Sequence, residues 1–114
     1  MQKYKLSKDV GGPIDKNKAK HWMKKFEDKH KDGVRAYFYG SDIIRKIIDH
    51  PEAVGMRIYF AYGDEDKFQT VLIGAREDGS NIWPEDTGKD GGNNAVVADT
   101  AFPCPPYCPP SQTE

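Results

Sequence analysis

A chain of 114 residues with 37% hydrophobic and 31% charged residues is long enough to bury one core without metals or disulfides, so we expect a single small domain. Its 17 basic and 18 acidic residues give a net charge of −1, which does not favour nucleic acid or an anionic membrane surface as a partner. No run approaches the roughly 18 apolar residues of a membrane span, and residues 1–12 lack the apolar run of a secretory signal, so we expect a cytoplasmic protein.

The first predicted element is an amphipathic helix that follows a flexible lead at 1–13. We expect Asp15 to cap its start and Asp32-Gly33 to end it. Apolar residues recur at helical spacing along one face, namely Ala19, Trp22, Met23 and Phe26, and His30 falls at the next position of that spacing. The opposite face is mostly lysine. Because acidic residues are interspersed among these lysines, we interpret them as a solvated face rather than a phosphate site.

A strand at 34–40 and a second helix at 42–50 follow. The strand reads VRAYFYG, and its β-branched and aromatic residues are typical of a sheet. We expect Ser41 to cap the helix, whose isoleucines form a broad apolar stripe. The helix should stop before Pro51, because a residue that precedes proline avoids the α conformation.

Two further β-rich runs, 55–63 and 68–75, predict an antiparallel hairpin joined by the acidic turn at 63–67. The turn is too short for a calcium loop, which spreads its ligands over about twelve residues. Both faces of the hairpin carry apolar residues, so the second face is either covered by the tail or is an interaction surface. Beyond the hairpin, 81–100 reads as a loop with a short edge strand at 95–99.

These elements together predict an α+β fold, in which one small antiparallel sheet carries two amphipathic helices on one face. We divide the chain into a lead at 1–13, a core domain at 14–80, a Gly/Asn/Asp-rich loop at 81–100 and a Pro/Cys-rich tail at 101–114.

The tail contains the sequence AFPCPPYCPP, in which Cys104 and Cys108 are separated by three residues. The two prolines between them forbid a helix, and in polyproline II four residues span about 12 Å, whereas a disulfide needs Cα atoms roughly 4.4–6.8 Å apart. A disulfide therefore requires a turn in this segment. Three possibilities stay open: a strap that buries Phe102, Tyr107 and free thiols against the sheet, a disulfide within or between chains, or part of a metal site.

Aromatic side chains are the other candidates for an interaction surface. The residues concerned are Phe102, Tyr107, Tyr37, Tyr59 and Trp83. An aromatic-lined groove can receive a proline-rich segment, here the chain's own tail or that of a neighbouring subunit. The alternative is that these aromatic side chains only pack the sheet.

Catalytic motifs are absent from the sequence, which contains no P-loop, G-x-G-x-x-G, G-x-S-x-G or H-E-x-x-H pattern. The three histidines, His21, His30 and His50, lack the spacing of metal ligands. We therefore assign no catalytic, metal or cofactor-binding residue and expect no cofactor. An enzyme stays an alternative, because a catalytic triad can be assembled from residues far apart in the sequence.

The run GMRIYFAYGDEDKFQTVLIGAREDGSNI, followed by PCPPYC, resembles an uncharacterised group of small Bacteroidota proteins. Members of the group have a G-x-R-I-Y-F-A strand, here Gly55 to Ala61, a T-x-V-L-x-G strand, represented here by the shorter run T-V-L-I-G within Thr70 to Gly74, and a C-terminal CPPxC tail. Their early helix has the pattern A-x-x-W/L-x-x-x-F/Y, here Ala19, Trp22 and Phe26. The resemblance spans most of 14–108, and it implies no activity.

The function expected from these features is that of a non-enzymatic binding or self-assembling module. Its tail would dock on its own or a neighbouring subunit, so a homo-oligomer or a protein partner is expected. One alternative is a redox-responsive or metal-linked protein that uses Cys104 and Cys108; another is a small enzyme with an unrecognised site.

Overall fold

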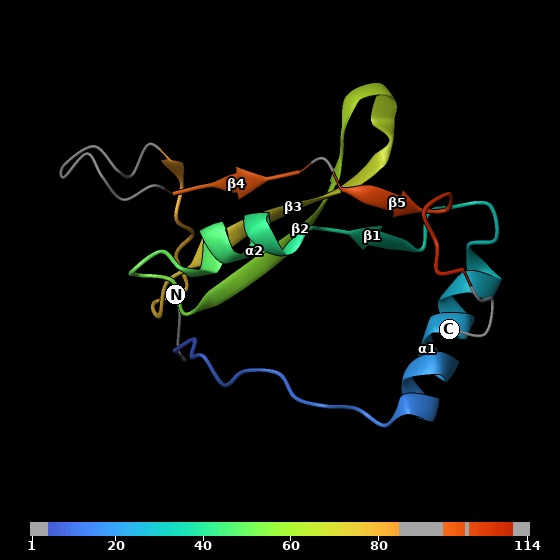
Figure 1. Ribbon diagram of the computed structural model, residues 1–114, viewed down its shortest axis with the longest axis horizontal. Coiled ribbons are helices and arrows are strands. Elements are labelled where there is room, and N and C mark those ends of the chain that lie inside the picture. Colours follow the sequence, from blue (N-terminus) through green and yellow to red (C-terminus); the bar gives the residue numbers. More distant parts are fainter. Residues whose placement is uncertain (1–4, 85–94, 100, 111–114) are drawn as a thin grey trace. The chain divides into compact units, whose positions relative to one another are not determined.

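The computed structural model describes residues 5–84, 95–99 and 101–110 (Figure 1). The described part of the chain contains two α-helices and small antiparallel sheets, which confirms the predicted α+β class. The strands form two sheets, one of three strands and one of two, instead of the single sheet expected. Parts of the predicted lead, loop and tail, at 1–4, 85–94, 100 and 111–114, lie outside the described residues.

The chain divides into two compact units, and each unit joins segments that are distant in the sequence. Unit 1 comprises residues 1–10 and 39–100, and unit 2 comprises residues 11–38 and 101–114. The three-stranded sheet belongs to unit 1 and the two-stranded sheet to unit 2.

The centre of unit 1 is the predicted hairpin, which is confirmed. Strand β2 (Gly55–Tyr62) pairs antiparallel with β3 (Phe68–Ala75), and the short 3-10 helix η1 (Asp64–Asp66) forms the turn between them. Strand β4 (Val97–Ala98) pairs with the other side of β3, so the sheet order is β2–β3–β4. The edge strand predicted at 95–99 is therefore also confirmed.

Helix α2 (Ser41–Ile48) packs on β2 and β3 and closes the core of unit 1 (Figure 1). Ile47 of this helix is 2% exposed and clusters with Leu72 and Ala98. Helix α2 approaches β3 closely at Gly74, where a Cβ would lie 3.3 Å from the carbonyl oxygen of Ile47, a tighter contact than most Cβ atoms make.

The start of α2 differs from the prediction. Gly40, not Ser41, is the N-cap residue, and the Ile44 N–H donates to its carbonyl group over 3.4 Å. Ser41 lies inside the first turn, where its hydroxyl oxygen accepts a hydrogen bond from Arg45 (3.3 Å) instead of from the backbone. The helix stops before Pro51 as expected, but it ends at Ile48, two residues earlier than the predicted range of 42–50.

Helix α1 (Lys16–Lys29) belongs to unit 2 and begins as predicted, because the Asp15 carboxylate accepts a hydrogen bond from the Lys18 N–H (3.1 Å). It ends earlier than expected. His30 is the C-cap residue; its Nδ1 lies 3.0 Å from the Phe26 carbonyl oxygen, and its ring stacks on Phe26. No residue within Lys16–Lys29, all of which are described, is buried.

The second sheet joins the middle of the chain to its tail. Strand β1 (Ala36–Phe38), shorter than the strand predicted at 34–40, pairs antiparallel with β5 (Phe102–Cys104). In this register Ala36 lies opposite Cys104 and Phe38 lies opposite Phe102. The tail is thus held to the body of unit 2 by main-chain pairing.

Candidate functional site

The tail forms a tight turn between its two cysteines. The chain turns after Cys104, and the Tyr107 N–H donates to the carbonyl oxygen of Pro103 over 2.9 Å. This turn replaces the extended polyproline conformation that would have kept the cysteines apart. It is the turn that a disulfide was predicted to require.

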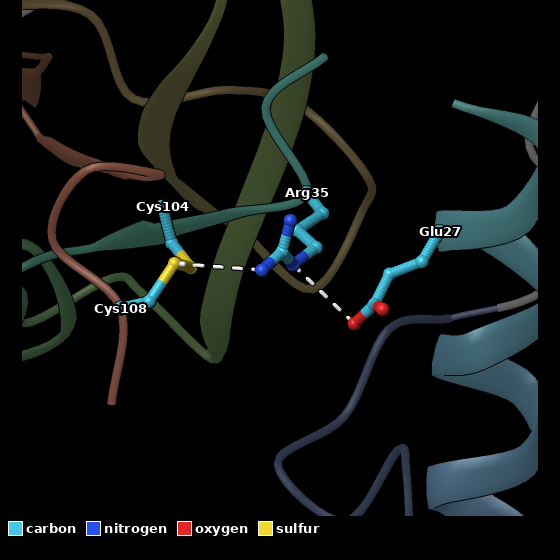
Figure 2. Close-up of a disulfide and its surroundings, with 4 residues drawn as sticks. All are labelled: Glu27, Arg35, Cys104 and Cys108. Atoms are coloured by element: carbon cyan, nitrogen blue, oxygen red, sulfur yellow. Dashed lines mark hydrogen bonds and ion pairs between the residues drawn. A yellow bond between two sulfur atoms is a disulfide. The ribbon is translucent and has the colours of Figure 1, made fainter. Parts of the chain in front are cut away.

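Cys104 and Cys108 form a disulfide across this turn, with their Cα atoms 4.7 Å apart (Figure 2). Cys104 is buried, with 7% of its surface exposed. Of the three possibilities that the sequence left open, the structure therefore has the disulfide within one chain. In the described residues, no group of three or more His, Cys, Asp or Glu side chains could hold a metal ion.

Arg35 links the tail to β1 and α1 (Figure 2). Its backbone N–H donates to the Cys104 carbonyl oxygen over 2.8 Å, and its Nη2 lies 3.9 Å from Sγ of Cys108, a long N–H···S contact. Its Nε lies 3.3 Å from Oε2 of Glu27 on α1. Both charged side chains are partly exposed, so the ion pair contributes about 1 kcal/mol or less and mainly orients the guanidinium group.

Three aromatic side chains beside the disulfide are exposed: Phe38 (64%), Phe102 (52%) and Tyr107 (59%). The rings of Phe102 and Tyr107 stack with centroids 4.6 Å apart, and Phe38 lies opposite Phe102 in the β1–β5 pair. We call these three residues the tail patch. Aromatic side chains that stay exposed in this way are typical of contact surfaces.

The residues predicted for an interaction surface are divided between the units. Phe102, Tyr107 and Tyr37 belong to unit 2, where Tyr37 lies opposite Pro103. Tyr59 and Trp83 belong to unit 1. The structure therefore brings part of the predicted set together around the tail.

Tyr59 takes part in a polar network on β2. Its hydroxyl oxygen accepts a hydrogen bond from the Asn81 side chain over 2.7 Å. Arg57 donates to the same Asn81 side chain (2.6 Å) and to the Gly79 carbonyl oxygen (2.9 Å). This network fixes the turn after β3 to β2.

Sequence reasoning missed Phe38, Arg35 and Glu27 as parts of the tail site. Phe38 was predicted only as a strand residue. In a chain that is 31% charged, a single arginine or glutamate gives no indication that it belongs to a site. Only the pairing of β1 with β5 shows that they lie beside the cysteines.

His50 in unit 1 is the one histidine buried within the described residues, with 7% exposed. Its Nδ1 accepts a hydrogen bond from the Glu52 N–H over 3.0 Å, and its Nε2 has no partner in the described part of the chain. His50 is part of no group of three or more His, Cys, Asp or Glu side chains that could hold a metal ion in the described residues.

Comparison of the chain with protein-family models, with curated proteins and with solved structures finds no match. The resemblance to the Bacteroidota group therefore stays a prediction. Neither of the helices in the described ranges is long and apolar enough to cross a membrane.

Proposed function

We propose that the protein is a non-enzymatic binding or self-assembling module and that the tail patch is one of its contact elements. The observation that carries this proposal is the exposure of Phe38 and Phe102 on one small sheet, together with Tyr107, which stacks on Phe102 from the turn that follows β5. Stacked aromatic side chains on a surface offer a large apolar area to a partner.

The way the patch is held supports a role in contact. The disulfide closes the turn that carries Tyr107, and main-chain pairing fixes Phe102 on β1. A surface that is already ordered loses less conformational entropy when it binds. A larger part of the free energy gained by burying its apolar side chains therefore contributes to the binding affinity. The apolar character of the patch favours a protein surface, either a second copy or another chain.

Removal of the tail tests this proposal. We expect deletion of 101–114 to lower both the thermal stability and the oligomer mass measured by light scattering, because β1 loses its strand partner. The matched variant Phe102→Ser with Tyr107→Ser keeps the disulfide and should lower only the mass. If neither variant changes the mass, the tail is not a contact element between copies of this chain.

A redox-responsive protein is a second candidate, supported by the disulfide itself. A dithiol reductant would transfer two electrons and two protons to the Cys104–Cys108 bond; the S–S bond breaks, two thiols form, and the reductant becomes a disulfide. The turn would then be free to open, and the contact between Arg35 and Cys108 would be lost.

Mass spectrometry with and without reductant tests this candidate. We expect an increase of about 2 Da and two titratable thiols on reduction, together with faster amide exchange in β1 and β5. Free thiols in the untreated protein would contradict it. The result also bears on the expected cytoplasmic location, because the reducing cytosol disfavours disulfides.

A further inference from the structure

Strand β2 forms one edge of the three-stranded sheet. Among the described residues β2 pairs only with β3, so its other side presents unpaired backbone groups. The Gly63 N–H donates to the Lys67 carbonyl oxygen (2.8 Å), which continues the ladder of the hairpin. Since bonding alternates along an antiparallel strand, the odd-numbered residues of β2 bond to β3. The N–H and C=O groups of the even-numbered residues therefore face outwards.

The same even-numbered residues carry exposed apolar side chains. Ile58 is 54%, Phe60 77% and Tyr62 76% exposed, although Met56 at the other end of the strand packs on the core. The hairpin extends past α2, which leaves this end of the sheet face uncovered by the helix (Figure 1). A long apolar edge strand is the element that most readily pairs with another chain.

We propose that β2 pairs antiparallel with β2 of a second copy of this chain, with Ile58 opposite Phe60 and Met56 opposite Tyr62 across a two-fold axis at Tyr59. In this register every outward-facing backbone group meets an outward-facing group of the second copy. Residues directly opposite each other share a face, so apolar side chains meet apolar side chains on both sides of the axis. The inference rests on the self-assembly part of the proposed function and names a second surface for it.

The charges of the hairpin favour a second copy in this antiparallel arrangement. The acidic turn at Asp64–Asp66 lies five residues from the axis, so the two turns would be about 34 Å apart, well beyond a Debye length of about 8 Å. Parallel pairing would place the acidic turns side by side. Arg57, the one charged residue of β2, would lie opposite Ala61 and meet no like charge.

Hydrogen exchange on the unmodified chain tests the proposal without a variant. We expect the amides of Ile58, Phe60 and Tyr62 to be exposed at low protein concentration and protected at high concentration, in step with the mass from sedimentation. A chain that self-associates while these amides stay unprotected would overturn the β2 register but leave the proposed function standing. A chain that stays monomeric would overturn the β2 pairing and the self-assembly part of the proposed function, but not the binding of another protein.

The variant Phe60→Lys should weaken the dimer by about tenfold or more, since the two-fold axis applies the substitution twice. Phe60 is exposed, so the fold should be retained, as circular dichroism can check. The matched control is Val10→Lys, which changes another apolar residue, 73% exposed, outside the edge. An unchanged dissociation constant for Phe60→Lys would contradict the register.

Cross-linking tests the position of the axis. Tyr59→Cys places two cysteines directly opposite, with Cα atoms about 4.5 Å apart, so oxidation should give a covalent dimer that peptide mapping assigns to position 59. Ala61→Cys is the control, because its two copies would lie about 14 Å apart and should not cross-link. Cross-linking of Ala61→Cys, or of neither variant in a protein that dimerises, would refute this axis.

Discussion

At the residue scale, Tyr39 ties the segment before α2 to the central strand of unit 1. Its hydroxyl group donates to the Thr70 carbonyl oxygen over 2.8 Å and lies 2.9 Å from the Thr70 hydroxyl oxygen. Thr70 is 8% exposed, so water cannot readily replace this partner. A buried polar group that loses its partner costs more than the hydrogen bond contributes when it is made.

Tyr39→Phe should therefore lower the free energy of unfolding by about 1–2 kcal/mol. Urea unfolding at low protein concentration measures this change. Tyr62→Phe is the control, because Tyr62 is 76% exposed and its hydroxyl group is solvated, so its loss should have no effect. Equal effects of the two variants would contradict the assigned role of Tyr39.

Asp78 is the residue whose charge matters most clearly for the turn after β3. The pKa of its carboxyl group lies below its ordinary value, mainly because Oδ1 accepts a hydrogen bond from the Ser80 hydroxyl (2.7 Å) and also one from the Ser80 N–H (2.9 Å). A carboxyl group with a lowered folded-state pKa contributes stability above its unfolded-state pKa of about 4, and this contribution is lost as the pH falls through the folded-state value.

Asp78→Ala should consequently lower the melting temperature at pH 7, and the difference from the unmodified chain should shrink as the pH falls below about 4. Thermal melts followed by circular dichroism across this range test the sign. Asp78→Asn keeps an acceptor for Ser80 and should show a smaller loss. A difference that grows towards acid pH would be inconsistent with this linkage.

At the element scale, local pattern predicted the elements that depend on nearby residues. Alternating side chains and a short polar turn were enough to predict the β2–β3 hairpin, and Asp15 was enough to predict the start of α1. The predicted N-cap of α2 was wrong by one residue. The N-cap residue is Gly40, which has no side chain to act as a cap, whereas the Ser41 that follows it has a typical capping side chain.

The pairing of β1 with β5 could not be predicted from the sequence. Each strand has three residues, which is too few for a periodic pattern. Pro103 in the middle of β5 has no N–H to donate to a neighbouring strand, so its presence argued against a strand there. The disulfide was one of three open possibilities, because it depends on whether the chain turns after Cys104. The tail patch was missed in part for the same reason.

The disulfide should stabilise unit 2 locally. In the chain-entropy description, a loop this short lowers the unfolded-state entropy enough to contribute about 2 kcal/mol. The double variant Cys104→Ser with Cys108→Ser should therefore speed exchange of the Arg35 amide by about tenfold or more, since that amide donates to Cys104.

The matched reference for this experiment is the Ile82 amide of unit 1, which donates to the Gly74 carbonyl oxygen over 2.9 Å. Its exchange rate should be unaffected by the double variant, because the disulfide lies in unit 2. Equal acceleration of the Arg35 and Ile82 amides would show a global loss of stability and contradict a local role.

At the scale of the whole molecule, each unit has large apolar side chains that are exposed to solvent. Unit 2 has the tail patch, and unit 1 has the open edge of β2 with Ile58, Phe60 and Tyr62. The chain has a net charge of only −1, so long-range repulsion between copies is weak. These features together support the proposal that the chain self-associates.

The mass of the intact chain in solution is the most direct test of this account. Sedimentation equilibrium from about 1 μM to about 1 mM covers the affinities expected of a surface this small. We predict a mass that rises with concentration from that of one chain, 12.9 kDa, towards that of two or more chains. A mass that stays at one chain over the whole range would contradict the account.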